Sequence, residues 1–140
     1  MSKALHTACR LADEQAVRLL LQHGAPVDVA DSTSGWRPLH RAVAENHSII
    51  VNLLLEQKAN VNACDRNMCR PLHLACEFGY LSLVKLLLSR GASSDCEDRM
   101  GVTPLKSAIR SGKVLCSFSS LYRISNSIQE YSLCMNSNSK

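Results

Sequence analysis

The side chains of this sequence that come closest to a chemical site are two histidines and two cysteines. Cys64, Cys69 and His73 lie within one stretch of ten residues, and thiolate and imidazole are the ligands that zinc prefers. Their spacing matches no zinc motif, and the seven cysteines include no Cys-x-x-Cys pair. His40 and His73 are candidates for acid–base chemistry, but no nucleophile, phosphate-cradling glycine loop or metal cluster accompanies them. We therefore expect no metal, no cofactor and no enzymatic activity.

Both histidines belong to a phrase that recurs along the chain. Pro38-Leu39-His40, Pro71-Leu72-His73 and Pro104-Leu105-Lys106 each begin 33 residues after the one before. An earlier copy begins at Ala4-Leu5-His6 with an offset of 34 residues, which places one extra residue in the stretch 31–34. A period of this length indicates one small supersecondary unit that is copied and stacked, because a single copy cannot bury its apolar face.

Proline suits the first turn of a helix, so the three prolines of the phrase predict three helix starts. Thr103 precedes one of them and is a good N-cap, since its hydroxyl can accept an amide hydrogen bond. Arg37 and Arg70 hold the same place and cannot accept such a bond, at a loss of about 1 kcal/mol of helix stability each. This loss is either incidental or a sign that arginine serves binding there.

The helix ends are also readable in the third copy. A first helix is predicted over 71–78 with Gly79 as its left-handed C-cap, and a second over 81–90 that ends at Gly91. Asn46 and Gly112 occupy the C-cap place in the neighbouring copies. Helices this short are marginal alone, so stacking must stabilise them.

With these residues the chain resembles the ankyrin repeat family, whose unit carries a Thr-Pro-Leu-His-x-Ala phrase in about 33 residues. The resemblance covers residues 1 to about 113 and implies an all-α solenoid of helix-turn-helix units with β-hairpin loops. We expect about 3.5 repeats, at 1–31, 32–65, 66–98 and an incomplete 99–113. In such a repeat, His40 and His73 hold the helix start and the hairpin together by hydrogen bonding.

The chain departs from the family pattern at several places. Arg37 and Arg70 stand where the family usually has threonine, Lys106 replaces the histidine, and Lys58 sits at the usual glycine. Met68 occupies the hairpin position that is glycine in the second and fourth copies.

The resemblance implies a non-catalytic protein-binding module whose partner meets the hairpin tips and the concave face of the first helices. Trp, Met and Arg, which are enriched in interfaces, occur among the residues at these positions. Carried over by position, the candidate binding residues are Trp36, Arg37, Glu45, Arg66, Asn67, Met68, Arg70, Glu77, Phe78, Arg99, Met100 and Arg110. The alternative is structural: Trp36 or Phe78 covers a neighbouring repeat.

The charge pattern bears on the kind of partner. The net charge is +4, and Arg37, Arg66, Arg70 and Arg99 fall in or beside predicted hairpins, where they would form a basic edge. Such an edge favours an acidic or phosphorylated segment of another protein, and the alternative is a solvated rim. No basic run or aromatic stacking set accompanies the arginines, so nucleic acid is disfavoured. No small-molecule substrate is expected.

Asn60-Val61-Asn62 is a further candidate site. It resembles the hairpin segment on which ankyrin proteins are often asparagine-hydroxylated, which makes Asn62 the candidate for modification.

The repeat pattern breaks after Lys113. Serine and asparagine supply 11 of the last 27 residues, so 114–140 is a divergent Ser/Asn-rich tail, as if a repeat were cut short and joined to unrelated sequence. Apolar residues at 3-4-3-4 spacing within 120–135 predict a helix that covers the last repeat, and a frayed tail is the alternative. No apolar run approaches a membrane span of about 20 residues, and the first residues carry no signal-peptide pattern.

We therefore expect an intracellular adaptor or scaffold, cytoplasmic and perhaps nuclear in the sense that neither compartment is excluded, without membrane insertion. Two alternatives stay open. One is a substrate-recruiting subunit, for example of a ubiquitin ligase, although the tail shows no docking motif that we recognise. The other is a truncated variant that competes with a longer ankyrin-repeat regulator.

Overall fold

The computed structural model describes residues 2–112 of the 140-residue chain. These residues form seven α-helices, and no β-strand occurs among them. The predicted tail helix over 120–135 and the divergent tail lie outside the described residues. The helices are α1 (Ser2–Arg10), α2 (Glu14–Gln22), α3 (Pro38–Ala44), α4 (Ser48–Glu56), α5 (Pro71–Phe78), α6 (Leu81–Ser89) and α7 (Pro104–Ser111).

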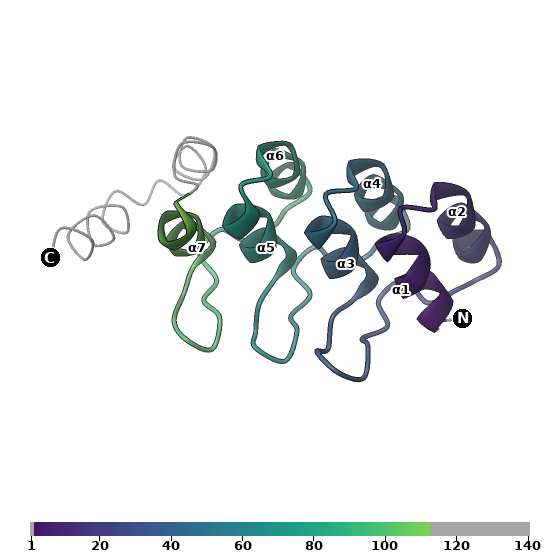
Figure 1. Ribbon diagram of the computed structural model, residues 1–140, viewed down its shortest axis with the longest axis horizontal. Coiled ribbons are helices and arrows are strands. Elements are labelled where there is room, and N and C mark those ends of the chain that lie inside the picture. Colours follow the sequence, from purple (N-terminus) through teal and green to yellow (C-terminus); the bar gives the residue numbers. More distant parts are fainter. Residues whose placement is uncertain (1, 113–140) are drawn as a thin grey trace, which may run out of the picture.

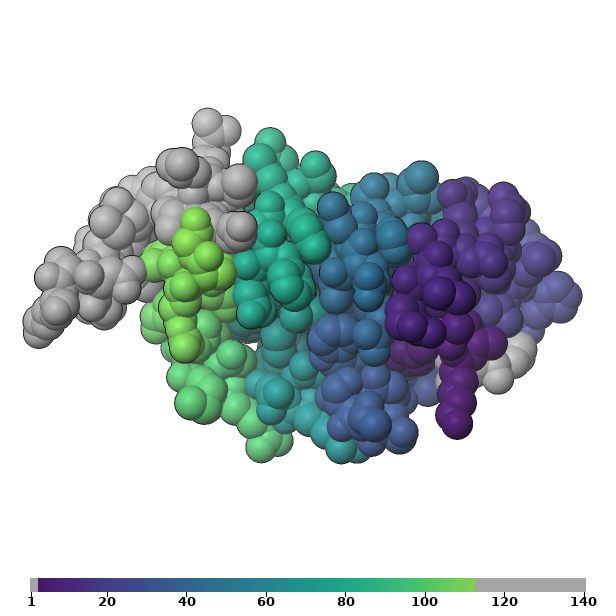
Figure 2. Space-filling view, in the orientation of Figure 1, coloured from purple at the N-terminus to yellow at the C-terminus, as the bar shows by residue number. Residues whose placement is uncertain are grey.

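The helices stack in two rows (Figure 1). The first helices of the repeats, α1, α3, α5 and α7, contact one another in chain order, and each of the first three also contacts the second helix of its own repeat. Long loops project from the row of first helices, and each repeat forms one slab of the surface (Figure 2). The predicted all-α solenoid is confirmed. None of the described helices has the length and apolar character needed to cross a bilayer.

The core follows the repeated phrase. Its leucines, Leu5, Leu39, Leu72 and Leu105, are 2% exposed or less, and burial of one leucine side chain is worth about 1.5–3 kcal/mol. The second helices supply Val17, Val51, Val84 and other buried aliphatic residues to the same continuous cluster. Each repeat therefore buries its apolar face against its neighbours.

The helix ends agree with the sequence-based predictions except at one residue. Each proline of the phrase is the first residue of its helix, and Thr103 Oγ1 accepts a hydrogen bond from the Lys106 N–H at 3.2 Å. Gly79 caps α5 with a φ of 72°. Helix α6 ends at Ser89 rather than at residue 90, because Arg90 has already left the helical conformation (φ −98°, ψ 14°).

The loops between repeats fold back on themselves like hairpins but carry single bonds in place of a strand ladder. The Asp31 N–H donates to the Trp36 carbonyl at 2.8 Å, and the Asp65 N–H donates to the Cys69 carbonyl at 3.0 Å. The first of these loops is one residue longer between its closing residues, which places the predicted extra residue there. Neighbouring tips are joined by a backbone bond from Arg66 N–H to the Ser34 carbonyl at 3.1 Å.

Candidate protein-binding surface

Each hairpin loop is closed by one aspartate. Asp31, Asp65 and Asp98 accept two backbone N–H groups each through Oδ1, at 2.8–3.0 Å. Burial opposes ionisation of Asp31, but hydrogen bonds from Ser34, Gly35 and Trp36 outweigh it and lower the pKa of this carboxyl. Sequence analysis missed these aspartates, although they recur with the repeat at offsets of 34 and 33 residues. Their role is to fix the shape of the tips.

The two histidines of the phrase join each repeat to the next hairpin. The Nδ1 atom of His40 accepts the Arg37 N–H at 3.1 Å, and its Nε2 lies 3.0 Å from the Cys69 carbonyl. His73 makes the same pair of bonds, to the Arg70 N–H at 3.2 Å and to the Val102 carbonyl at 2.8 Å. Because Nδ1 accepts, Nε2 must carry the proton. The predicted hydrogen-bonding role of both histidines is confirmed.

Burial keeps these rings neutral. It lowers the pKa of His40 and of His73, and the carbonyl that each Nε2 contacts only partly offsets this effect. With both nitrogens occupied, neither ring has a nitrogen left for a metal. No group of three metal-ligating side chains occurs among residues 2–112. Burial also raises the pKa of the Cys69 thiol to about 12, so this group stays protonated.

Trp36 is half-buried and packs between repeats. Its Nε1–H donates to Asp65 Oδ2 at 3.1 Å, and its ring stacks on His40 with 6.1 Å between the ring centroids. The guanidinium carbon of Arg41 lies 4.6 Å from the centre of the Trp36 ring. The indole therefore stabilises the stack, so a Trp36 variant is a poor test of partner binding taken alone.

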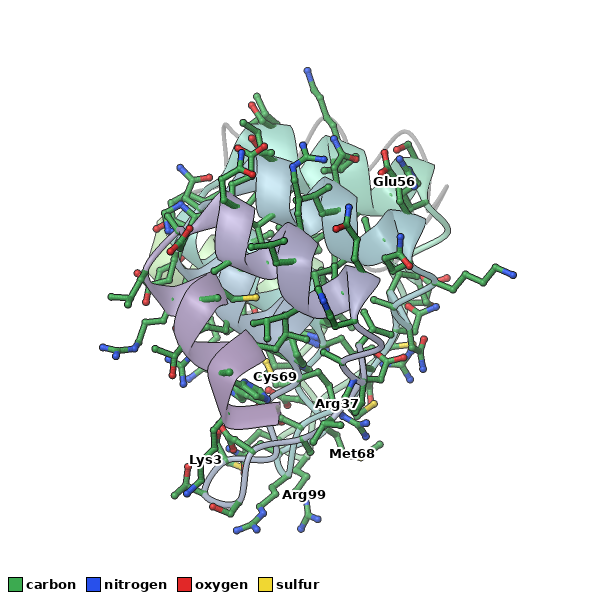
Figure 3. All side chains as sticks on the ribbon, turned by 90° about the vertical axis from the view of Figure 1, so that its right-hand side faces the viewer. Lys3, Arg37, Glu56, Met68, Cys69 and Arg99 are labelled. Carbon is green, nitrogen blue, oxygen red and sulfur yellow. The ribbon has the colours of Figure 1, made fainter. Side chains whose placement is uncertain are left out.

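The four hairpin arginines divide into two pairs. Arg37 and Arg70 are half-buried, and the Nε atom of each is buried without a hydrogen-bond partner among the described residues. The guanidinium of Arg37 donates to the Asp28 carbonyl. Arg66 and Arg99 are exposed at the tips, where Figure 3 shows Arg99 at the lower edge of the molecule. The predicted basic edge is thus mainly the work of Arg66 and Arg99.

Three large apolar side chains also stay exposed on this side of the molecule. Met100 is 84% exposed, and Met68 and Phe78 are 43% exposed each. Met68 adopts a φ of 59°, close to the 75° of Gly35 and Gly101 at the same place in neighbouring hairpins. The other predicted binding residues, Glu45, Asn67, Glu77 and Arg110, are exposed too.

Two grooves lie between the hairpins and the first helices. The N-terminal groove, of about 390 Å³, is lined by Lys3, His6, Thr7, Arg10, Ala30, Asp31, Ser32 and Arg41. The C-terminal groove, of about 330 Å³, is lined by Glu77, Asp98, Val102, Ser107, Arg110 and Ser111. Of the residues predicted from sequence, Glu77 and Arg110 line a groove. The N-terminal groove was not predicted, because its residues belong to the copy that lacks the Pro-Leu-His phrase and a hairpin of its own.

Asn62 is half-buried and bridges two repeats. Its Oδ1 accepts the Ser93 N–H at 2.8 Å, and its Nδ2 donates to the Gly91 carbonyl at 3.3 Å. The place of this residue in the fold is therefore structural. Its hydroxylation stays a prediction.

A stack of two-helix repeats with bonded hairpins defines a solenoid of the protein-interaction class. A family model described as ankyrin repeats (3 copies) matches residues 2–65 and again residues 58–118. The chain belongs to the ankyrin repeat family, whose repeats form a non-catalytic fold that mediates protein–protein interaction.

Several curated proteins are similar over part of their length. The B-cell lymphoma 3 protein homolog of Mus musculus is 48% identical over 60 residues, which cover 43% of this chain and 13% of the relative. Rabankyrin-5 of Homo sapiens is 34% identical, and the match covers 46% of this chain and 7% of the relative. The 2-5A-dependent ribonuclease of Mus musculus is 38% identical, with 46% and 9% covered. The chain thus spans a small part of each of these relatives.

Proposed function

We propose that this chain is an intracellular adaptor or scaffold that binds another protein through its hairpin tips and the faces of its first helices. The observation that carries the proposal is the exposure of Met68, Phe78 and Met100 beside the exposed arginines of the tips. Apolar side chains next to arginine are typical of the parts of an interface that contribute most to affinity.

The backbone at Met68 supports the same surface. A non-glycine residue at a φ of 59° is strained by about 1–2 kcal/mol, and the neighbouring hairpins avoid this strain with glycine. Strain of this kind concentrates at functional sites. We propose that Met68 serves the partner and that its strain is tolerated because the Asp65 carboxylate fixes the loop through Asn67 and Cys69.

Partner capture with surface variants tests the proposal. Immobilised chain is incubated with cell extract, the captured proteins are identified, and the affinity of the purified partner is then measured. Met100→Glu should weaken binding by about tenfold or more, because it places a charge in the apolar part of the interface. Ile49→Glu is the matched control, since Ile49 is 56% exposed on α4, away from the hairpins.

An equal loss of affinity in both variants, or no loss in Met100→Glu, would count against this surface. The helical circular dichroism signal must be the same in all forms, so that a folding defect is not read as lost binding. Imaging of the tagged chain in cells checks the proposed cytoplasmic and nuclear location, which a secreted chain would contradict.

A further inference from the structure

The two grooves on the binding side carry opposite charge. The N-terminal groove is lined by three cations, Lys3, Arg10 and Arg41, against one carboxylate, Asp31. The C-terminal groove is lined by two carboxylates, Glu77 and Asp98, against one cation, Arg110. Grooves of one sign concentrate ligands of the opposite sign, so the two ends of this face differ in what they attract.

The single carboxylate of the N-terminal groove does not neutralise its cations. Asp31 Oδ1 already accepts the N–H groups of Ser34 and Gly35 at 2.8 and 2.9 Å, and Arg41 lies 3.9 Å from Oδ2. Among residues 2–112, Lys3 and Arg10 form no ion pair, whereas Arg18 on the next helix pairs with its neighbour Glu14 at 2.8 Å. Lys3 and Arg10 therefore present unbalanced positive charge.

Arg41 is held in place before any ligand arrives. Its guanidinium lies over the Trp36 ring, and its side chain is 28% exposed. A cation that is partly desolvated and fixed over an aromatic ring loses little conformational freedom on binding. Trp36, which sequence analysis placed at the interface, thus contributes by orienting Arg41.

Resting on the proposed function, we infer that the N-terminal groove binds an extended acidic peptide segment of the partner protein. Lys3 and Arg10 are seven residues apart, which places them on one face of α1 about 10 Å apart along the helix axis. An extended peptide covers about 10 Å in three residues, so two carboxylates at positions i and i+3 match this spacing. The groove recognises an acidic-x-x-acidic pattern.

A peptide fits this groove better than a phosphate group or a nucleic acid. A single phosphate cannot span two cations about 10 Å apart. No aromatic side chain other than the ring of His6 lines the groove, so bases have little to stack on. The hydroxyl groups of Thr7 and Ser32 offer hydrogen bonds that suit a peptide backbone.

Three synthetic peptides test the inference on the full chain by fluorescence anisotropy. One labelled glycine-rich peptide carries two glutamates at i and i+3, a second carries them side by side, and a third has glutamine in both places. The first peptide should bind several-fold more tightly than the second, and the third should not bind. Raising NaCl from roughly 50 to roughly 300 mM should weaken binding, as expected for partly exposed charges.

Charge reversal locates the site. Arg10→Glu and Lys3→Glu should each weaken binding of the first peptide by about tenfold, since each turns an attraction into a repulsion. Lys85→Glu is the matched control, because it makes the same charge change at an exposed position on α6. Equal effects of Arg10→Glu and Lys85→Glu, equal binding of the glutamine peptide, or full competition by inorganic phosphate at equal concentration would each overturn the inference.

The result separates this inference from the proposed function. If Arg10→Glu leaves the affinity for the captured partner unchanged while Met100→Glu lowers it, the groove assignment fails and the adaptor proposal stands. If the peptide binds as described while Met100→Glu has no effect on partner capture, the acidic-peptide site stands and the binding surface proposed around the tips fails.

Discussion

The joint between α1 and the hairpin that follows it differs from the next two joints along the stack. His40 and His73 use both ring nitrogens, one for the N–H of the residue that precedes their own helix and one for a carbonyl of the next hairpin. His6 contacts the Val29 carbonyl through Nε2 at 2.7 Å, while its Nδ1 is buried without a partner among residues 2–112.

The reason for the difference is local. Arg37 and Arg70 are extended N-cap residues whose N–H groups point back to the ring, whereas Lys3 already lies inside α1. The second difference is the longer hairpin 31–36, which offers His6 a carbonyl at a different place from the one His40 and His73 use. The comparison teaches that one histidine stabilises a joint fully only where a hairpin precedes its helix.

Removal of a histidine should have the largest effect on stability, and the effect should depend on the joint. His40→Ala leaves the Arg37 N–H and the Cys69 carbonyl unpaired, and each buried unpaired group costs about 1–3 kcal/mol. We expect a loss of about 3 kcal/mol for His40→Ala and about half of that for His6→Ala. Urea unfolding followed by circular dichroism gives both values, and equal losses would contradict the comparison.

Acidification should weaken the two complete joints. Burial lowers the pKa of His40 and His73 below the ordinary value of 6.5, so the folded state binds fewer protons than the unfolded state. Their contribution to stability is therefore present above about pH 6.5 and is lost as the pH falls toward and through the folded-state pKa. A protonated Nδ1 can no longer accept the Arg37 N–H.

Unfolding free energies measured from pH 7.5 down to pH 5 should show this decline. A His40→Gln/His73→Gln double variant should show a shallower decline over the same range. An identical pH dependence in the two proteins would exclude these histidines as the cause.

The turn between the paired helices gives a smaller test of the same comparison. Ala12, Asn46, Gly79 and Gly112 occupy equivalent places, and all four have a positive φ between 59° and 79°. Alanine is strained in this conformation, whereas asparagine tolerates it. Ala12→Gly should therefore raise the stability by about 1 kcal/mol, and Asn46→Gly should change it by a few tenths.

Thermal unfolding of the two glycine variants beside the unchanged chain measures this difference. A larger gain from Asn46→Gly than from Ala12→Gly would show that the first repeat is not the more strained region.

The fold was largely predictable because its signals repeat. The proline of the phrase marks the start of α3, α5 and α7, and the glycines mark helix ends, since each acts through its own backbone. The closing aspartates of the hairpins carry a signal of the same kind that the analysis passed over. The end of α6 was misplaced by one residue, because Arg90 has no backbone preference that marks it as a cap.

The binding side was less predictable. Arg37, Arg66, Arg70 and Arg99 are chemically alike and lie in equivalent loops, yet two are half-buried and two are exposed. Their exposure depends on the neighbouring repeat that packs over each loop, and the one-dimensional pattern contains no term for it. The N-terminal groove likewise joins Lys3 and Arg10 of the first copy to Arg41 of the second.

The sequence by itself determined the repeat, the helix starts and the buried leucines, because proline, glycine and apolar periodicity act on their own segment of chain. The tertiary structure alone decided which polar side chains remain available to a partner. It did so through contacts between residues about 30 positions apart, such as Trp36 with Asp65 and His73 with Val102. Stacking buries one side of each repeat, and the charge that this burial leaves unpaired on the other side is what a partner meets.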